Sequence, residues 1–501
     1  MVVDASAVAR VLGISVTYED MRGDRAAYLP QQLGVYAQGK TGTVFSTTKR
    51  RVTSAAQAGT LYGFGSPIHL ICRELFPENG DGVGTVPVII HPLEDAYESG
   101  VASTARIIPA GSQTKQTSNR VRVGGVFSQW FTVPAEATVA TRCDLVVAAV
   151  NGVLHSPMAA VDGTTDVDLT SKWAGESANG IVIEVPDGVN EDDFGPIEGG
   201  TWSAVQPTGG SVNPDVSAAL ASVGNVWETM MLNAMNADDE DTLDLFQAFG
   251  DGRWLPTVRR PCVAFVGNTE ADMSTATLIT DTRDEDKINV QLVAPGSPNL
   301  PFVVAARQLA RIIRQANNDP ATGYGAKRVD RIVAGEDSEQ WDDTTRNAAL
   351  QAGSSTVDVV DGVITIGNVV TMYHPAGETP PAFSNVVAIV RLQTAIFNFD
   401  MVFGAEEWAA APLIPDGQAT VNPNAKTPSM AKTEAFSIID GLADAAIISD
   451  PATAKKNVTA TIDPGNPNRL NLVVPLQLSG NTEVKSVEIK FGYYFGGAAA
   501  A

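Results

Sequence analysis

The sequence predicts a mixed α/β (α+β) protein that carries an inserted β-rich domain and has β-strands at both ends of the chain. Between about residues 30 and 100, apolar strands alternate with a helical pattern, which is typical of a βαβ unit with a partly parallel sheet. From about 101 to 205, short β-rich runs lie between turns rich in Gly, Thr, Asn and Asp. After 206, strands and helices alternate again, so the middle segment reads as an insertion.

The 501 residues are enough for two or three domains, each with a core. The predicted domain boundaries lie where the pattern of predicted strands and helices changes. They separate an N-terminal arm at 1–22, a first core segment at 23–100, an inserted β-rich domain at 101–205, a second core segment at 206–465 and C-terminal strands at 466–501. The stretch EDDFGPIEGG and then QPTGGSVNPD are predicted to form the linker by which the chain leaves the insertion.

Three consecutive elements are predicted in the first core segment. LGVYAQG (33–39) and TVPVIIHPL (85–93) are short apolar runs, which are typical of buried strands. GSPIHLICRELF (65–76) lies between them and has the spacing of a helix. A strand, a helix and a strand in this order favour parallel pairing of the two strands.

The second core segment continues the same alternation. PCVAFVGN (261–268) and INVQLVAP (288–295) are predicted strands on either side of a helical ADMSTATLIT. VVAARQLARIIRQANNDP (303–320) has the apolar spacing of an amphipathic helix that ends at Asp319-Pro320. A further helix is predicted from one apolar face, formed by Ala219, Leu220, Val223, Trp227, Met230, Met231 and Ala234.

The net charge of −23, from 34 Lys+Arg against 57 Asp+Glu, limits the partners of the chain. An acidic surface repels phosphate backbones and anionic lipids, so neither nucleic acid nor a membrane is an expected partner. The start, MVVDASAVARVLG, lacks the basic and long apolar regions of a secretory signal, and no stretch is judged long enough to span a membrane. We expect a protein that is made in the cytoplasm.

Residues 34–41, GVYAQGKT, match the phosphate-binding loop pattern G-x-x-x-x-G-K-[ST] at every fixed position. A working loop needs a strand before its first glycine and a helix that opens at Lys40 and Thr41. Here the apolar residues overlap the loop itself, and Val35 and Tyr36 would crowd the backbone N–H groups that hold phosphates. We interpret the match as a strand that ends in a Gly-Lys turn, with a phosphate-loop NTPase as the alternative.

No other pattern in the sequence predicts an active site, a cofactor site or a metal site. The histidines occur singly, and no H-x-x-H or G-x-S-x-G pattern is present. The acidic run NADDEDTLD (236–244) lacks the glycine and alternation of a calcium loop. Cys72, Cys143 and Cys262 are interpreted as buried thiols, and their odd number leaves an intermolecular disulfide open.

Both ends of the chain are predicted to form strands with one apolar face. Exposed strand edges tend to pair with other chains, so these arms are expected to add strands to sheets of neighbouring subunits. SGNT (479–482) is predicted to be a turn between the two runs at the C-terminal end, which would then form a hairpin or two consecutive strands. The predicted donation residues are Leu12, Ile14, Val16 and Tyr18 at the N-terminal end and Leu470, Leu472, Val474, Leu476, Leu478, Val487, Ile489, Phe491 and Tyr493 at the C-terminal end.

The order of several segments resembles the contractile tail sheath proteins of myophages, nearest the Mu-like branch. The segments are TLYGFGSPIHLICREL, WAGESANGIVIEV, LFQAFGDGRWLP, RIIRQANNDPATGYG and RNAALQAGSSTVDVVDGVITIGNVVTMY. The resemblance spans roughly residues 30–400 and is carried by the ordered series rather than by one motif. It implies a discontinuous core built from both chain ends, with the inserted domain facing outward.

The resemblance also implies a function and a set of partners. Hexameric rings of this virion structural protein would stack as a helical polymer around a tail tube protein, between a baseplate and the tail terminator or neck proteins. Contraction from a metastable extended state would drive the tube through the host envelope for genome ejection, with no enzyme activity and no cofactor. The alternatives are a phosphate-loop NTPase of phage assembly and a secreted β-rich adhesin, against which the missing signal argues.

Overall fold

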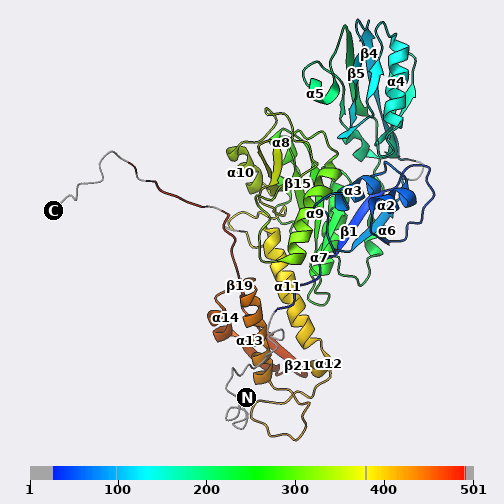
Figure 1. Cartoon of the computed structure of the whole chain (residues 1–501). Coiled ribbons are helices and arrows are strands. Elements are labelled where there is room, and N and C mark those ends of the chain that lie inside the picture. The colour runs from blue at the N-terminus through cyan, green and yellow to red at the C-terminus, as the bar shows by residue number, and fades with distance from the viewer. Residues whose placement is uncertain (1–25, 97–98, 379–380, 484, 490, 492–501) are drawn as a thin grey trace, which may run out of the picture. The chain divides into compact units, whose positions relative to one another are not determined.

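The computed structural model describes residues 26–96, 99–378, 381–483, 485–489 and 491 (Figure 1). The chain divides into two compact units. The core unit comprises Leu29–Gln393 and Gly480–Ala501, and the terminal unit comprises Met1–Tyr28 and Thr394–Ser479. The predicted second core segment, 206–465, is therefore shared between the two units. The sequence gives no sign of this division because it falls within one continuous helix, α11 (Val386–Phe403).

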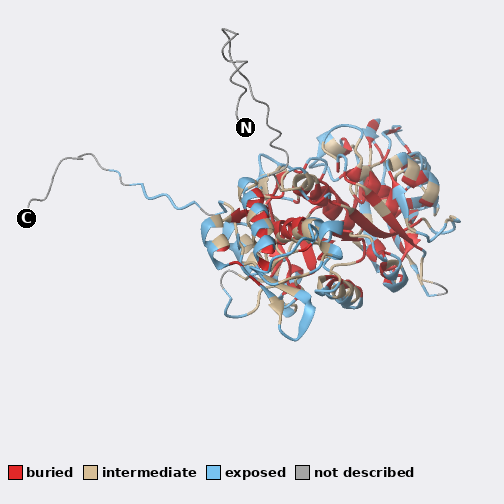
Figure 2. Ribbon diagram, turned by 90° about the horizontal axis from the view of Figure 1, so that it is seen from below, coloured by how far each residue is buried: buried red, intermediate tan, exposed pale blue. Residues whose placement is uncertain are grey.

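A seven-stranded sheet is the centre of the core unit. All neighbouring strands pair in parallel except β2, which is antiparallel to β3. In spatial order the strands are β16 (Ser354–Ser355), β15 (Asn289–Val293), β14 (Val263–Asn268), β13 (Met230–Asn233), β1 (Leu33–Gln38), β3 (Val88–Leu93) and β2 (Arg50–Val52). The four strands predicted at 33–39, 85–93, 261–268 and 288–295 are confirmed. Their continuous apolar runs reflect burial on both faces, as Figure 2 shows in red.

Helices cover this sheet, and those predicted at 65–76 and 303–320 are confirmed. They are α3 (Pro67–Leu75) and α9 (Pro301–Asn318), which pack against each other. Ser66 caps α3 by accepting a hydrogen bond from the His69 N–H at 3.2 Å. A Cβ at Gly267 of β14 would lie 1.8 Å from the Pro301 carbonyl oxygen, so this glycine lets α9 approach the sheet. The other helices are α2 (Ala55–Tyr62), α6 (Ser217–Ala221), α7 (Glu240–Trp254), α8 (Met273–Ala276) and α10 (Asp343–Gln351).

The predicted helix through Ala219–Ala234 is wrong. Only the first part forms a helix, α6, and Met230–Asn233 form strand β13 in the middle of the sheet. Gly224 adopts a left-handed φ of 59° and ends the helical course of the chain. Met230 and Met231 are fully buried because β13 has helices on both faces. A segment whose residues are all apolar matches the spacing of a helix as well as that of a strand, so the sequence pattern could not tell the two apart.

Residues 101–211 include the predicted insertion (101–205), are called the insert below, and form sheets of their own. A four-stranded antiparallel sheet runs in the order β12 (Gly200–Thr208), β4 (Ala102–Gly111), β10 (Val167–Ala174), β9 (Met158–Asp162), and helix α4 (Val139–Asn151) packs against it. Its strands alternate between buried and exposed residues, as expected for a sheet with one wet face. Short strands form two more sheets, β5 (Thr117–Asn119) with β8 (Phe131–Val133), and β11 (Ile183–Glu184), β6 (Arg122–Val123) and β7 (Val126–Phe127), beside α5 (Glu191–Phe194).

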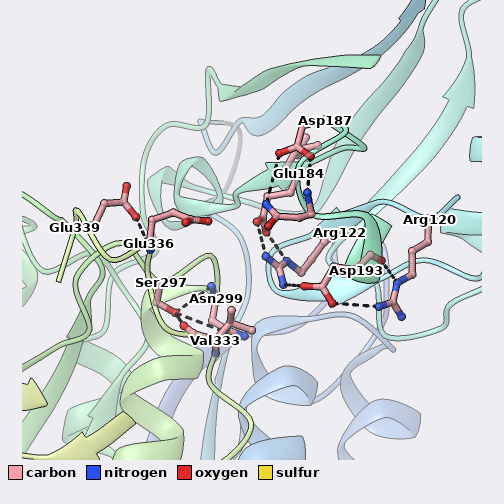
Figure 3. A network of polar contacts seen from close by, with 12 residues as sticks. Arg120, Arg122, Glu184, Asp187, Asp193, Ser297, Asn299, Val333, Glu336 and Glu339 are labelled. Carbon is pink, nitrogen blue, oxygen red and sulfur yellow. Dashed lines mark hydrogen bonds and ion pairs between the residues drawn. The ribbon is translucent and has the colours of Figure 1, made fainter. Parts of the chain in front are cut away.

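A polar network lies where the insert meets the rest of the core unit (Figure 3). Arg122 on β6 pairs with Glu184 on β11 and also reaches Asp193 at 3.7 Å. Arg120 pairs with Asp193 at 3.5 Å and lies 3.6 Å from the ring centroid of Phe127. Each arginine of this network thus has a carboxylate partner, which offsets the cost of its partial burial.

The terminal unit contains the second part of α11 and a small helical and β assembly. Its helices are α12 (Glu406–Ala409), α13 (Pro428–Asp444) and α14 (Pro451–Asn457). Two antiparallel pairs of strands complete it, β20 (Thr459–Asp463) with β21 (Asn466–Val473), and β19 (Ile448–Ser449) with β22 (Gln477–Leu478). The described part of its core is small and rich in alanine, with Ala431, Ala435 and Leu442 fully buried.

By length and composition alone, one helix of the described residues, α11, is apolar enough to cross a membrane, whereas the sequence predicted no such stretch. Half of its apolar window is buried inside the protein. Its polar side chains bond to backbone: Arg391 donates to the Ala321 carbonyl oxygen, and Gln393 donates to that of Pro261 at 3.0 Å. These contacts are typical of a core helix in a folded domain.

Candidate inter-subunit surface at the C-terminal segment

The structure separates the predicted donation residues into four groups. Leu12, Ile14, Val16, Tyr18 and Tyr493 lie outside the described residues. Leu470, Leu472 and Leu478 lie in strands that pair within their own chain, opposite Ile462, Ala460 and Ile448. Val474 and Leu476 lie between β21 and β22. Val487, Ile489 and Phe491 belong to no helix or strand.

The predicted hairpin between residues 470–478 and 487–495 is not formed by the described residues. The partner of β21 is instead β20, which precedes it in the chain. The turn between them is DPGN, in which one Asp463 carboxylate oxygen accepts hydrogen bonds from the backbone N–H groups of Gly465 and Asn466 at 2.8 and 3.1 Å. The sequence could have predicted this hairpin from TATI-DPGN-PNRLNL. Asp-Pro-Gly is a strong turn sequence, and it lies here between two runs in which apolar and polar residues alternate.

The start of the C-terminal segment is anchored in the core unit. Asn481 accepts a hydrogen bond from the Arg391 guanidinium of α11. Asn385 donates to the Glu483 carboxylate at 2.7 Å. A Cβ at Gly323 would lie 2.6 Å from the Asn481 side-chain nitrogen, so the segment packs closely against this glycine.

Beyond this anchor the segment exposes large apolar side chains in alternation. Val487, Ile489 and Phe491 are 76%, 77% and 92% exposed. Figure 2 shows this part of the chain as an exposed ribbon. Three apolar residues at a period of two, exposed together, form the apolar face that a strand needs in order to pair with a sheet.

A groove lies beside the anchor. It has a volume of about 1120 Å³ and is lined by α10, by the hairpin of β17 (Val357–Val360) and β18 (Val363–Ile366), and by residues at the start of the C-terminal segment. Arg346 on α10 pairs with Asp343 and Asp358, so its charge is neutralised within the groove wall. Tyr324 on the wall is buried, and burial raises the pKa of its hydroxyl, which therefore stays neutral.

The phosphate-loop pattern does not form a phosphate site. Residues 33–38 are β1, an inner strand of the sheet, and no helix begins at Lys40, because the next one, α2, begins at Ala55. A Cβ at Gly34 would lie 2.1 Å from a carboxylate oxygen of Glu228, which fills the space beside the strand. Tyr36 donates to Glu228 at 3.0 Å, and His91 contacts the same carboxylate at 2.8 Å. The pattern therefore belongs to a packed strand and the turn that follows it.

The remaining chemistry-bearing residues fit structural roles. All three cysteines are buried and free, and burial raises the pKa of the Cys72 thiol to about 12. Cys262 has its pKa raised to about 12 by the same cause. Among the described ranges of the chain, no group of three or more His, Cys, Asp or Glu side chains is arranged to hold a metal ion.

Comparison with curated proteins reveals one clear sequence relative. No family model matches the chain. The chain is 23% identical over 463 residues to the Mu-like prophage FluMu tail sheath protein of Haemophilus influenzae, and the alignment covers 90% of each protein. The chain is a homologue of a prophage tail sheath protein. Sheath proteins are structural proteins and not enzymes, so the comparison confirms the prediction of a structural role.

Solved structures of sheath proteins also align with this sheath homologue. The sheath tail protein of Desulfitobacterium hafniense aligns with a TM-score of 0.46 at 13% identity, over 93% of this chain and 100% of that chain. The sheath tail protein of Listeria innocua aligns with a TM-score of 0.49 at 10% identity, over 92% and 94%. The contracted helical sheath of the anti-feeding prophage aligns with a TM-score of 0.47 at 8% identity, over 97% and 99%.

Proposed function

We propose that the sheath homologue is the force-generating subunit of a contractile phage tail. The observation that carries the proposal is the similarity to a tail sheath protein along 90% of both chains. Copies would assemble as stacked hexameric rings around a tail tube, in contact with baseplate and neck proteins. The assembled protein would reside in the virion tail after assembly in the host cytoplasm.

The exposed C-terminal segment supports a polymer held together by exchanged strands. Val487, Ile489 and Phe491 gain about 25 cal/mol for each Å² of apolar surface that a neighbouring copy covers. Backbone pairing along the same stretch adds the hydrogen bonds of a strand. The N-terminal residues Leu12 to Tyr18 have the same alternation in the sequence and are proposed to donate a strand in the same way.

The β20–β21 hairpin supplies edges on which such strands would pair. Among the described residues, neither strand pairs with a third one, and residues 466–469 of β21 are exposed. An open edge of this kind pairs readily with an extended chain. Because a donated strand goes to a different copy from the one that donates it, the contact is head-to-tail and propagates into a helical polymer.

Contraction then follows as a rearrangement of linked subunits. A polymer that assembles in an extended, metastable packing lowers its free energy when its subunits rotate into a denser one. The exchanged strands would keep neighbours joined during that rotation, while the tube is driven through the host envelope. The energy is stored during assembly, so the proposal needs no nucleotide at Lys40.

Electron microscopy of the purified full-length protein tests the proposal. We expect hollow striated cylinders. A variant with Val487→Asp and Ile489→Asp should stay monomeric, because a charged strand face does not pair with an apolar sheet. The matched control carries Val44→Asp and Val421→Asp, which change two valines that are 98% and 103% exposed and lie outside the arms. The control should still form cylinders.

Each outcome of these experiments tests a different part of the proposal. Cylinders from the Val487→Asp, Ile489→Asp variant would overturn strand donation by the C-terminal segment. Only monomers from the unaltered protein, at every concentration and salt tested, would overturn the sheath function itself. Hydrolysis of ATP or GTP by the purified protein would favour the NTPase alternative.

A further inference from the structure

A cluster of basic side chains lies where the insert meets the rest of the core unit. Lys40 follows strand β1, and His69 and Arg73 lie on α3. His155 and Lys172 come from the insert. Their charges act on one another: Lys40 acts on Lys172, and Arg73 and Lys172 act on both histidines. These five residues are called the junction cluster below.

Glycines at the junction allow this close approach. A Cβ at Gly65 would lie 2.8 Å from the Lys172 ammonium nitrogen, and one at Gly63 would lie 2.5 Å from the Lys40 Cβ. Both glycines have a left-handed φ, of 83° and 90°. The Thr41 N–H donates to the Lys172 carbonyl oxygen at 2.8 Å, which joins the two parts of the chain directly.

The lysines and the arginine of the junction cluster lack an ion-pair partner in the part of the chain that the structure describes. Among the ion pairs between described residues, none involves Lys40, Arg73 or Lys172. Asp95 accepts hydrogen bonds from Thr41 and Gln38, and Glu74 forms its ion pair with Arg331 at 2.9 Å. Glu74 and Glu78 also attract the Arg73 guanidinium, but neither forms an ion pair with it among the described residues. The Lys172 ammonium donates to the Leu154 carbonyl oxygen, at 3.3 Å.

This arrangement differs from the network in Figure 3, which lies on the same insert. There Arg120 and Arg122 share the carboxylates of Glu184 and Asp193. In the junction cluster, burial and the neighbouring cations together lower the pKa of Lys172 to about 8 and the pKa values of His69 and His155 to about 4. A group of cations without ion pairs among the described residues is also unusual in a chain of net charge −23.

We propose that the junction cluster binds carboxylates of a second copy of this chain. The inference rests on the proposed function, in which copies pack side by side. Any neighbouring copy presents a mainly acidic surface, because the chain has 57 Asp+Glu against 34 Lys+Arg. Exposed carboxylates such as Asp238, Glu240 and Asp241 are of the kind that fits. A nucleic acid fits less well, since the net charge of the chain repels a polyanion.

The pairing would strengthen as subunits assemble. A carboxylate that approaches the cluster relieves the repulsion among its cations, and it does so in a partly desolvated place where ion pairs are stronger than in water. Because Lys40 and Arg73 belong to one part of the core unit and Lys172 to the insert, one bound carboxylate contacts both parts. Subunit packing would thereby fasten the insert at the junction.

Zero-length carbodiimide crosslinking of the full-length assembled protein tests the proposal. Copies labelled with ¹⁴N and ¹⁵N are mixed before assembly, so that crosslinks between copies have hybrid masses. We expect hybrid crosslinks from Lys172 and Lys40 to Asp or Glu residues. Cylinders in which these lysines crosslink only within one copy, or not at all, would overturn the inference while leaving the sheath function intact.

Charge variants give a second, independent measurement. Lys172→Met should raise the protein concentration needed for assembly at least threefold, and Lys172→Glu at least tenfold. The control is Lys115→Met, which changes a lysine of the insert that is 72% exposed and already pairs with Glu198 at 3.1 Å. It should change assembly less than twofold. Equal effects of Lys172→Met and Lys115→Met would contradict the proposal.

A third measurement separates a neighbouring copy from a free anion. Inorganic phosphate is added to the full-length Val487→Asp, Ile489→Asp variant while the His155 ring is followed by NMR. We expect no shift below about 10 mM phosphate, because the site would need the several carboxylates and the shape of a packed copy. A saturating shift at lower concentrations, without hybrid crosslinks in the assembled protein, would assign the site to a free anion and overturn the proposal.

Discussion

The Lys172 side chain is partly buried and lies beside a second lysine, Lys40. Burial and the repulsion from the Lys40 charge together lower the pKa of Lys172 from 10.5 to about 8. The unfolded chain keeps the ordinary pKa, so between pH 8 and 10.5 the unfolded state binds more protons than the folded state. The free energy of unfolding therefore rises with pH across this window. Below about pH 8 both states are protonated, and the penalty is fully present.

The substitution Lys172→Met should remove that pH dependence. In the non-assembling Val487→Asp, Ile489→Asp background, the urea midpoint of unfolding should rise between about pH 8 and 10 with Lys172 present and stay flatter with methionine in its place. At about pH 7 the methionine variant should be the more stable of the two, because it has no charge to desolvate. Unfolding at several pH values, with Lys115→Met as the control, checks this. Identical pH profiles with and without the Lys172→Met substitution would contradict it.

Two glycines of α7 make a matched pair for testing packing. A Cβ at Gly250 would lie 2.6 Å from a side-chain carbon of Ile288, which is fully buried, whereas one at Gly252 meets nothing within 4 Å. Gly250→Ala should lower the free energy of unfolding by about 1–3 kcal/mol through overpacking. Gly252→Ala should raise it by about 0.5–1 kcal/mol, since alanine favours a helix. Denaturant unfolding of both variants measures the difference, and effects of equal sign would disprove the packing argument.

At the scale of elements, sequence patterns predict those with one strong period or one strong boundary. The amphipathic α9 and the buried strands β1, β14 and β15 follow from their apolar spacing and length. Strand β13 could not be told from a helix, because its residues are apolar on every side once helices cover both faces of the sheet. Its identity depends on neighbours distant in sequence, chiefly β1 and β14.

The candidate site was predicted only in part, for a related reason. Alternation marks Val487, Ile489 and Phe491 as a strand face, but alternation does not say which strand is the partner. Leu470 and Leu472 have the same alternation and pair within the chain, because the DPGN turn brings β20 beside them. The junction cluster has no sequence signal, since its residues come from distant segments of the chain, at 40, 69–73, 155 and 172.

The C-terminal element should depend on its anchor. Asn481→Ala removes the acceptor of the Arg391 hydrogen bond and should release the residues that follow, at a cost of about 1 kcal/mol or less to the core unit. A nitroxide on Lys485→Cys reports this, because the three native cysteines are buried and should not react. We expect a narrower, more mobile spectrum in the Asn481→Ala protein than in an Asn471→Ala control. Unchanged spectra would show that the anchor does not restrain the segment.

At the scale of the whole molecule, the two units differ in how they are stabilised. The core unit encloses a seven-stranded sheet whose central strands are buried along their length. The terminal unit is built on short strands and an alanine-rich core, with much of β21 exposed or half-buried. Burial of less apolar surface gives less stabilisation, so the terminal unit is expected to open at a lower free energy.

Hydrogen exchange should resolve this difference. Amides of β1, β13 and β14 should exchange only when the core unit unfolds, whereas amides of β20 and β21 should exchange at least about a hundredfold faster in the isolated protein. Assembly should slow the β20–β21 amides if neighbouring strands pair with that hairpin. Mass spectrometry of the full-length monomer and of cylinders compares the two. Equal protection of both units in the monomer would contradict the expected order of stability.

The attachment of Asn481 to Arg391 determines how tension would travel through a subunit. A pull on the tail of one copy arrives first at Asn481 and Glu483 and passes through their partners, Arg391 and Asn385, to the start of α11 and the residue just before it. The same helix continues into the terminal unit without a break in its backbone. Mechanical load taken up at the tail is thus delivered to a helix of the core unit rather than to a loop.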